Sequence, residues 1–511
     1  MDKAREEEQR RMSEPLLAGA AKDAEPTEPG PEELGGFGVF SIMKNLAQMC
    51  IMFVPLLLNL TCAYGINLST LAFVGHLGTD TLAAAALGTS IVGMLGRTVM
   101  YGLVGGLDTL ASQAYGAGNL AAMGGHFRVA VLFLLLHLAP LLGLLGALPL
   151  LLQREETAAD LGFMAGRYVR LMLPALVFEC LNRPMNSVLV AQRITAPQMT
   201  IQVIALALHI STNYVLIHLL GLGYLGGAVA TSCTAAYVFL MTSSYVLCSG
   251  LGPRVWGGAG LQTPTWKDLR SFARLSYPAC VMKCAESWGF SFMTVAAGKL
   301  PDPGTAVSAA SISFNIYGVL FMCFSAFAVT TCTQVGNALG AGSARGARHA
   351  ALTSLCTSPL LWVGIATLLV EPHTQRLLTL IFTDGKDASL SAHLHRMLVL
   401  VAALELFDGS QVVMTGVIQG AGKQRLGMLV NVIAFYVVAI PAALGLAFGL
   451  HWGVEGMYTG MMLGPAIQAA AYAAIILKLD WREEARKVAA RAAARHGSRG
   501  NGEGEGEGEA S

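Results

Sequence analysis

Twelve stretches of mostly apolar residues divide this chain, and each is long enough to cross a lipid bilayer as a helix. Such a helix needs about 20 consecutive apolar residues, because the hydrocarbon core is about 30 Å thick and cannot solvate exposed backbone groups. The sequence therefore predicts an all-α integral membrane protein with twelve transmembrane helices. The predicted spans are 44–72, 80–105, 127–152, 168–192, 197–220, 224–249, 272–299, 305–330, 349–371, 394–420, 425–448 and 453–478.

Composition agrees with a membrane location. The chain is 54% hydrophobic and 13% charged, whereas about a quarter of the residues in soluble domains are charged. A net charge of +1 leaves no dominant basic face, so nucleic acid is not an expected partner. The ten cysteines show neither a CxxC pair nor metal-ligand spacing, and we interpret most of them as small core residues. No metal or other cofactor is expected.

The charged and flexible-looking segments divide the chain into five regions. Because the number of spans is even, both termini lie on the same side of the membrane. Loops on that side carry more Lys and Arg than the opposite loops, so both termini are expected to be cytoplasmic. The predicted regions are a disordered N-terminal tail (1–40), helices 1–6 (41–249), a cytoplasmic linker (250–271), helices 7–12 (272–480) and a cytoplasmic C-terminal tail (481–511), which starts with an amphipathic helix at the membrane surface.

Two glycine-rich segments repeat each other across the chain. One reads QAYGAGN at 113–119 and the other QVGNALGAG at 334–342, and each follows an apolar stretch. Both halves start on the same side of the membrane, which predicts two six-helix lobes related by a parallel internal repeat. Neither segment has the form of a phosphate-binding loop. We therefore expect their small residues to permit tight turns and close helix approach.

Four motifs resemble those of a known family. They are FVGHLG at 73–78, LDTLASQAYG at 107–116, VGNALGAG at 335–342 and NVIAFYVVAIP at 431–441. In this order, the motifs resemble those of the multidrug and toxic compound extrusion (MATE) transporters, specifically the eukaryotic branch. The resemblance covers residues 40–482. It implies a secondary antiporter, not an enzyme, that exports an organic solute by alternating access in exchange for cations, usually protons.

Two acidic residues within predicted spans are the main candidates for that exchange. An ionisable group at the centre of a membrane helix costs about 3 kcal/mol or more, so its presence calls for a reason. Glu286 lies deep in the seventh span and Asp408 in the tenth. The resemblance places an acid at each position and implies proton coupling and organic-cation binding at Glu286. A structural role, as a paired or capping carboxylate, is the alternative for both.

Lys283 departs from the family pattern. It lies three residues before Glu286, on the same helical face, where the family usually has an apolar residue. A Lys283–Glu286 ion pair would neutralise the site and would favour anionic or zwitterionic substrates. Two further acids of the family are absent, because Ser291 and Ala306 stand in their places.

Other polar residues complete the candidate set. Asn59, in the first span, is a candidate for substrate or proton binding, whereas Asp108, Gln113, Asn337 and Pro441 are candidates for gating or structural roles. Asp108 is expected to cap a turn or bind a loop amide. In the first lobe, Glu179 and Arg183 have the i, i+4 spacing of an ion pair, and Glu179 is also the expected cross-helix partner of Arg97.

The sequence leaves several alternatives open. The expected function is export of cationic drugs, toxins or metabolites in exchange for protons, by a monomer in contact with membrane lipid. An exporter of organic anions such as citrate or conjugates, a lipid-linked-oligosaccharide flippase of related architecture and a non-transporting receptor are the alternatives. Sodium coupling is less expected than proton coupling. The membrane is expected to be the plasma membrane or that of a vacuole or lysosome.

Overall fold

The computed structural model consists of two compact units, Met1–Ala47 and Gln48–Ser511. Apart from the first turns of α2 (Val39–Gly75), the helices belong to the second unit. The predicted N-terminal tail at 1–40 therefore lies almost entirely outside the described residues. The structure describes residues 39–152, 159–256, 263–300, 305–382 and 388–491.

The first half of the chain folds into long helices, two of which contain a short π-helical segment. They are α2, α3 (Thr79–Ile91), η2 (Val92–Arg97), α4 (Thr98–Gly116), α5 (Leu120–Leu152), α6 (Ala159–Ala191), α7 (Ala196–Tyr214), η3 (Val215–Leu219) and α8 (Tyr224–Cys248). The segments α3, η2 and α4 form one continuous span, as do α7 and η3. A short helix, α9 (Gly252–Trp256), follows.

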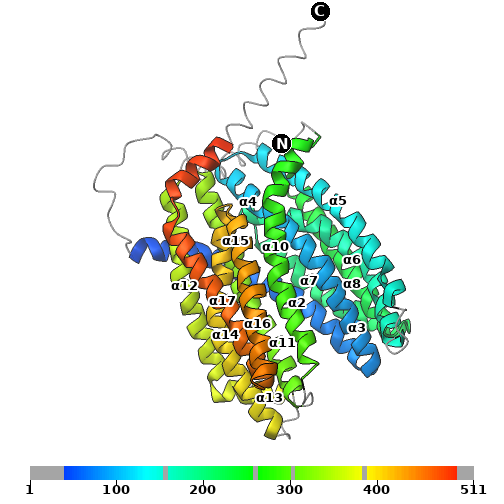
Figure 1. The fold of residues 1–511 in the computed structure, drawn as a ribbon. Helices are drawn as coiled ribbons and strands as arrows, with labels where there is room; N and C mark the ends of the chain where they lie inside the picture. The colour runs from blue at the N-terminus through cyan, green and yellow to red at the C-terminus, as the bar shows by residue number, and fades with distance from the viewer. Residues whose placement is uncertain (1–38, 153–158, 257–262, 301–304, 383–387, 492–511) are drawn as a thin grey trace, which may run out of the picture. The chain divides into compact units, whose positions relative to one another are not determined.

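The second half repeats this plan. Its helices are α10 (Trp266–Ala297), α11 (Thr305–Gly340), α12 (Ala344–Val370), α13 (Pro372–Phe382), α14 (Ala388–Gly420), α15 (Gln424–Val432), η4 (Ile433–Ala439), α16 (Ile440–Leu444), η5 (Gly445–Gly449) and α17 (Gly453–Lys478). Figure 1 shows α5, α6, α7 and α8 gathered on one side and α12, α14, α15 and α17 on the other. We call the helices of the first half of the chain, α2 to α8, the N-lobe and those of the second half, α10 to α17, the C-lobe. The predicted all-α, two-lobed fold is confirmed.

Eleven helices in the described residues are long and apolar enough to span a membrane. The predicted seventh span, α10, is not among them although it is 32 residues long. Its composition explains the difference, because Lys283 and Glu286 interrupt its apolar run and Lys267, Asp268 and Arg270 occupy its first turns. A capping box between Thr265 and Asp268 starts the helix. Thus α10 carries much of the charge of the C-lobe.

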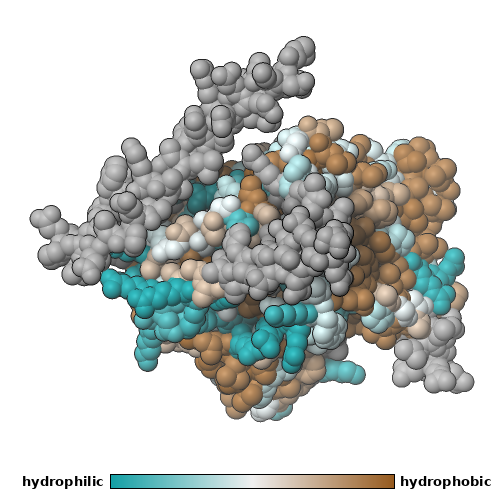
Figure 2. Space-filling model, turned by 90° about the horizontal axis from the view of Figure 1, so that it is seen from above, coloured by the Kyte–Doolittle hydropathy of each residue, from teal (hydrophilic) through white to brown (hydrophobic). Residues whose placement is uncertain are grey.

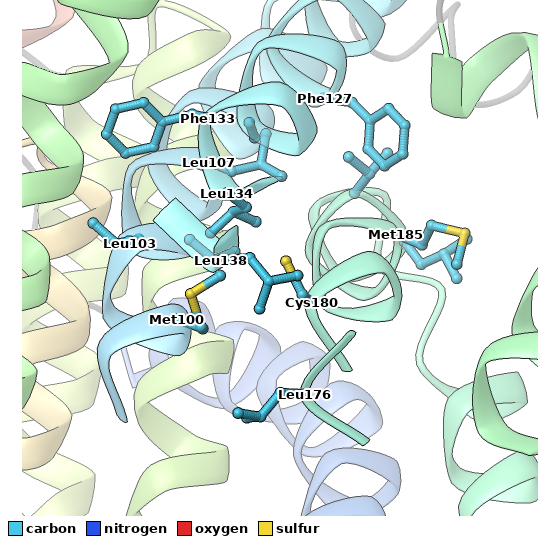
Figure 3. Close-up of a cluster of buried hydrophobic side chains, with 14 of the residues drawn as sticks. Met100, Leu103, Leu107, Phe127, Phe133, Leu134, Leu138, Leu176, Cys180 and Met185 are labelled. Atoms are coloured by element: carbon cyan, nitrogen blue, oxygen red, sulfur yellow. The ribbon is translucent and has the colours of Figure 1, made fainter. Parts of the chain in front are cut away.

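A dense apolar core holds the N-lobe together. Met100, Leu103 and Leu107 of α4 meet Phe133 and other side chains of α5, and α6 closes the cluster from the other side (Figure 3). These side chains are almost fully buried, and burying each one contributes about 1.5–3 kcal/mol relative to leaving it in water. The core fixes α4, whose other face meets the C-lobe.

The outside of the molecule is apolar, as a lipid-facing surface requires. Large apolar residues such as Ile51, Leu219, Leu360 and Leu477 are more than half exposed. Figure 2 shows hydrophobic residues covering much of one flank of the molecule. An apolar surface of this extent is rare on soluble monomers, and it fits a chain whose helices contact hydrocarbon.

A helix at 481–491 follows α17 and packs onto the C-lobe. Trp481, Ala485 and Val488 are buried in the same apolar cluster as residues of α11, α14 and α17. Glu484 accepts hydrogen bonds from Lys423, at 2.8 Å, and Lys487, at 3.0 Å. The predicted amphipathic helix is present, and its apolar face lies against protein.

Lys423→Met is expected to loosen this helix. Burial pushes the pKa of Glu484 upward, but the hydrogen bonds and charges of Lys423 and Lys487 outweigh it and hold this pKa below its ordinary value. The ion pair therefore stabilises the fold fully above about pH 4.3, and the contribution is lost as the pH falls through the lowered pKa. At neutral pH the variant should lose about 1–3 kcal/mol, measured by thermal unfolding in detergent. Arg482→Gln, on the exposed face of the same helix, is the control, and equal unfolding temperatures in the two variants would contradict the expectation.

Candidate functional site

A cavity of about 530 Å³ lies between the two lobes. Its walls are mostly apolar but carry several charged and amide side chains, which are rare inside membrane proteins. The N-lobe contributes Asn59, Asn67, Arg97, Tyr101, Asp108, Glu179, Asn182 and Arg183, and the C-lobe contributes Lys283, Glu286, Phe321, Thr415, Gln419 and Asn431. The structure therefore places three of the four predicted binding residues, Asn59, Lys283 and Glu286, on one cavity. The fourth, Asp408, lies behind its wall.

The N-lobe wall carries two ion pairs across helices. Arg97 binds Glu179 in a bidentate manner, with Nε–Oε2 and Nη2–Oε1 distances of 2.9 Å. Arg183 lies 3.6 Å from Asp108 and stacks over the ring of Tyr101. The expected Arg97–Glu179 pair is confirmed. The Glu179–Arg183 pair suggested by spacing is wrong, because Asp108 of α4 attracts Arg183 instead.

This pairing also changes the interpretation of Asp108. Its carboxylate faces Arg183 and the cavity, and it does not cap a turn as expected. Its main-chain oxygen accepts a hydrogen bond from Ser112 Oγ at 2.8 Å. Because each arginine has a carboxylate partner, the two pairs add no net charge to the N-lobe wall.

In the C-lobe, a glutamine connects the two predicted carboxylates. Glu286 is 8% exposed and Asp408 is fully buried. Gln411 Nε2 donates to Asp408 Oδ1 at 3.1 Å and lies 3.4 Å from Glu286 Oε1. The Tyr317 hydroxyl donates to the other oxygen of Asp408 at 2.8 Å. Glu286 therefore meets the cavity, and Asp408 lies one hydrogen-bonding residue deeper.

Sequence reasoning missed three members of this group: Tyr317, Gln411 and Glu405. Glu405 is fully buried on α14, one turn before Asp408. Its position carried a usable signal, because a second acid three residues from Asp408 in an apolar run is as costly as the first. Tyr317 lies on α11, far away in sequence, and nothing local marked it.

Lys283 faces the cavity without neutralising Glu286. Its ammonium group lies 5.2 Å from the centre of the Phe321 ring, a cation–π arrangement. Among the residues that the structure describes, Lys283 forms no ion pair within 4 Å, so the suggested Lys283–Glu286 pair is not formed. The C-lobe side of the cavity therefore presents a carboxyl and an ammonium group separately.

At one end the cavity is closed by hydrogen bonds between the lobes. Thr109 of α4 donates to the Gln419 carbonyl at 2.7 Å, and Gln113 Nε2 donates to the Gly420 carbonyl at 3.0 Å. On the other side of the contact, Asn337 Nδ2 donates to the Ala191 carbonyl at 3.2 Å. We call this set of contacts the gate. The predicted gating residues Gln113 and Asn337 both belong to it.

Glycines of the two repeated segments form the centre of the gate. A Cβ atom added at Gly116 would overlap the carbonyl oxygen of Asn337, and one at Gly340 would overlap that of Gln113. The two segments that match in sequence therefore touch in space, with α4 against α11. Only glycine lets the backbones approach this closely, as the sequence predicted.

Pro441 lies within the eleventh span at a place where the helix widens. The segment η4 precedes it and η5 follows within the same span, and both are π-helical. Proline cannot donate the usual backbone hydrogen bond, and a π-helical turn is one way to accommodate the defect. Asn431, earlier in this span, accepts hydrogen bonds from Gln468 and Tyr472 and reaches the cavity wall.

Within the described residues, no three His, Cys, Asp or Glu side chains converge closely enough to hold a metal ion. Among the described residues, the site offers hydrogen-bonding groups, the carboxyl of Glu286, the amino group of Lys283 and two ion pairs. Such a cavity can bind an organic solute.

Comparison with known proteins identifies the family. The MatE family model matches residues 55–215 and 278–444, one segment in each half of the chain. Protein DETOXIFICATION 17 of Arabidopsis thaliana is 29% identical over 381 residues, which are 75% of this chain and 79% of that protein. Human multidrug and toxin extrusion protein 1 is 29% identical over 435 residues, 84% of this chain and 75% of that protein.

Solved structures of MATE transporters have the same fold. The eukaryotic MATE transporter AtDTX14 superimposes with a TM-score of 0.82 at 25% identity, covering 88% of this chain and 99% of that one. An outward-facing multidrug resistance MATE transporter has a TM-score of 0.74 and supports the fold. The match in both halves and over most of each relative leaves one conclusion: this chain belongs to the MatE family of multidrug and toxin extrusion transporters, which are multi-pass membrane proteins and not enzymes.

Proposed function

We propose that this protein exports organic cations in exchange for protons. The observation that carries the proposal is the pair of buried carboxyls in the C-lobe, with Glu286 at the cavity and Asp408 behind it. Burial favours the neutral form of a carboxyl, and a cation placed beside it favours the ionised form. The same group can therefore hold either a proton or a cationic substrate.

The exchange follows from this competition. With the cavity open to the proton-rich side, Glu286 takes a proton and releases the substrate cation. With the cavity open to the cytoplasm, the proton leaves and the carboxylate attracts the next cation. Proton and substrate must stabilise the two states differently for the exchange to be coupled. The excess of Lys and Arg in the loops next to the gate supports a cytoplasmic position for it. In that orientation, this structure is the state closed to the cytoplasm.

Lys283 supports a second candidate, the export of organic anions such as citrate. Its ammonium group lines the cavity without a carboxylate partner among the described side chains. A substrate carboxylate could bind it directly, and Phe321 would then face the apolar part of the substrate. Human multidrug and toxin extrusion protein 1 and the Arabidopsis protein DETOXIFICATION 17 are named for drugs, toxins and detoxification, which supports an organic solute as the substrate under either candidate.

Counterflow in proteoliposomes tests both candidates. Liposomes containing the purified chain are given a pH gradient, at a membrane potential clamped to zero, and loaded with labelled tetraethylammonium or labelled citrate. Proton-driven flux of tetraethylammonium supports the first candidate, and flux of citrate supports the second. Flux of either tracer that follows a sodium gradient and ignores the pH gradient would overturn proton coupling.

Lys283→Met is expected to raise the apparent affinity for tetraethylammonium by about tenfold, because it removes a like charge from a partly dehydrated cavity. Concentration dependence of tracer uptake measures the change. Lys299→Met, on an exposed lysine outside the cavity, is the control. If Lys283→Met leaves the tetraethylammonium affinity unchanged and abolishes citrate flux, the first candidate fails and the second stands.

The proposal includes a membrane location and an oligomeric state. We expect a monomer with both termini in the cytoplasm, in the plasma membrane or in a vacuolar or lysosomal membrane. The cavity is lined by both lobes of one chain, so no second copy is needed to form it, which supports the monomer.

A further inference from the structure

A third carboxyl, that of Glu405, lies one turn of helix from Asp408 in the C-lobe. Glu405 is fully buried, and neither of its carboxyl oxygens has a hydrogen-bond partner among the described residues. Asp408 follows one turn later on the same face of α14. A buried ionised carboxylate without hydrogen bonds or a counter-ion is among the costliest groups in a protein, and protonation removes that cost.

The surroundings of Glu405 are acidic on balance. On α11, Tyr317 lies within electrostatic reach of all three carboxyls, and Cys323 lies within reach of Glu405. The ionisable groups around Glu405 and its neighbour Asp408 are Glu286 and Lys283 on α10, Tyr317 and Cys323 on α11, and Tyr458 on α17. Lys283 is the one cation in this set, and its ammonium group is placed over Phe321 at the cavity. Nothing in the set neutralises Glu405 directly.

The three carboxyls form a series that leads away from the cavity. Glu286 meets the cavity, Gln411 joins it to Asp408, and Tyr317 covers the far oxygen of Asp408. Glu405 comes next along α14. Two neighbouring carboxyls ionise in separate steps, since the first charge opposes the second.

We propose that Glu405 is a second proton-binding site of the C-lobe, filled through Asp408, so that each transport cycle exchanges two protons for one substrate molecule. The carboxylate of Glu405 accepts the proton of the Asp408 carboxylic acid after its side chain rotates toward Asp408, because the two carboxyls share no hydrogen bond in this structure. Asp408 is reprotonated from the cavity side, where Glu286 lies. Substrate binding reverses both transfers. No other bond forms or breaks. The inference rests on the proposed proton coupling.

The coupling ratio tests it. At zero membrane potential, the substrate gradient that stops net flux equals the proton gradient raised to the number of protons exchanged. With a pH difference of about one unit, two protons hold a gradient of about 100-fold and one proton holds about tenfold. Labelled tetraethylammonium is the probe, and citrate replaces it if the wild type carries only citrate. We expect about 100-fold for the wild type and for Glu371→Gln, a control outside the spans, and about tenfold for Glu405→Gln. Equal gradients in wild type and Glu405→Gln would overturn the inference.

Infrared spectroscopy gives a readout that does not need transport. Purified wild-type protein should show, at neutral pH, a protonated-carboxyl band from Glu405 beside that of Asp408, and Glu405→Gln should lack the Glu405 band, while both proteins elute as monodisperse species. Glu405→Met, of similar volume, serves if the glutamine variant does not fold. An identical carboxyl band in wild type and variant overturns the inference. If instead the band is lost but the wild type shows no pH-driven flux, the proposed proton coupling fails and the proton site stands.

Discussion

Gly116→Ala should abolish transport. The added methyl group would overlap the carbonyl oxygen of Asn337, so the two lobes could no longer meet at the gate. Moving a two-state equilibrium from 1:99 to 99:1 takes about 5.5 kcal/mol, and a backbone overlap in a packed contact can supply a penalty of this size. Tracer uptake into proteoliposomes should therefore fall by about 100-fold, while spin labels on the two lobes should report a wider gate.

The chain offers a matched control for this experiment. Gly125 lies in a helix, α5, with nothing within 4 Å of an added Cβ atom. Gly125→Ala should transport normally and should be slightly more stable, because alanine favours helix. Normal uptake and an unchanged gate distance in Gly116→Ala would show that the close contact is dispensable.

Glu286→Gln should eliminate proton-driven exchange. Glutamine keeps the shape and the hydrogen bond to Gln411 but can neither release a proton nor attract a cation. Uptake of tetraethylammonium driven by a pH gradient should fall by about 100-fold. Binding of the cation should weaken as well, because Lys283 would then be the one charged side chain of the cavity without an ion-pair partner among the described residues.

A control variant at another carboxylate separates this effect from a general loss of negative charge. Glu455 lies in the first turn of α17, outside the cavity, so Glu455→Gln should retain full exchange. Proton-driven uptake in Glu286→Gln at the wild-type rate would remove Glu286 from the coupling mechanism. Citrate flux that survives Glu286→Gln would assign the substrate to Lys283.

The sequence predicted the features that depend on local pattern. The length of the apolar stretches predicts the helices, and the charge of the loops predicts their orientation. The sequence repeat between 113–119 and 334–342 predicts two lobes. The family motifs, together with the rule that acids are rare within apolar spans, led to Glu286 and Asp408. The prediction that the small residues of the repeat allow close helix approach is confirmed, because Gly116 and Gly340 touch the opposite backbone.

What the sequence could not predict depends on which helix faces which. Arg183 has Glu179 at i−4 on its own helix, yet it turns to Asp108 because Arg97 already holds Glu179. Lys283 has Glu286 at i+3, yet it lies over Phe321. Local spacing indicates only that two side chains can meet. Cross-helix partners decide whether they do, and those partners are set by the packing of both lobes.

The helix at 481–491 is connected to the gate, so its position should change when the gate opens. Lys423 holds Glu484 at 2.8 Å, and the next residue, Gln424, donates to Thr109 of the gate at 2.6 Å. A single short loop therefore connects the gate to a surface helix. A fluorophore on that helix would report gate opening in real time. By thermodynamic reciprocity, a binder that distinguishes the two positions of the helix would bias the transporter toward one of its states.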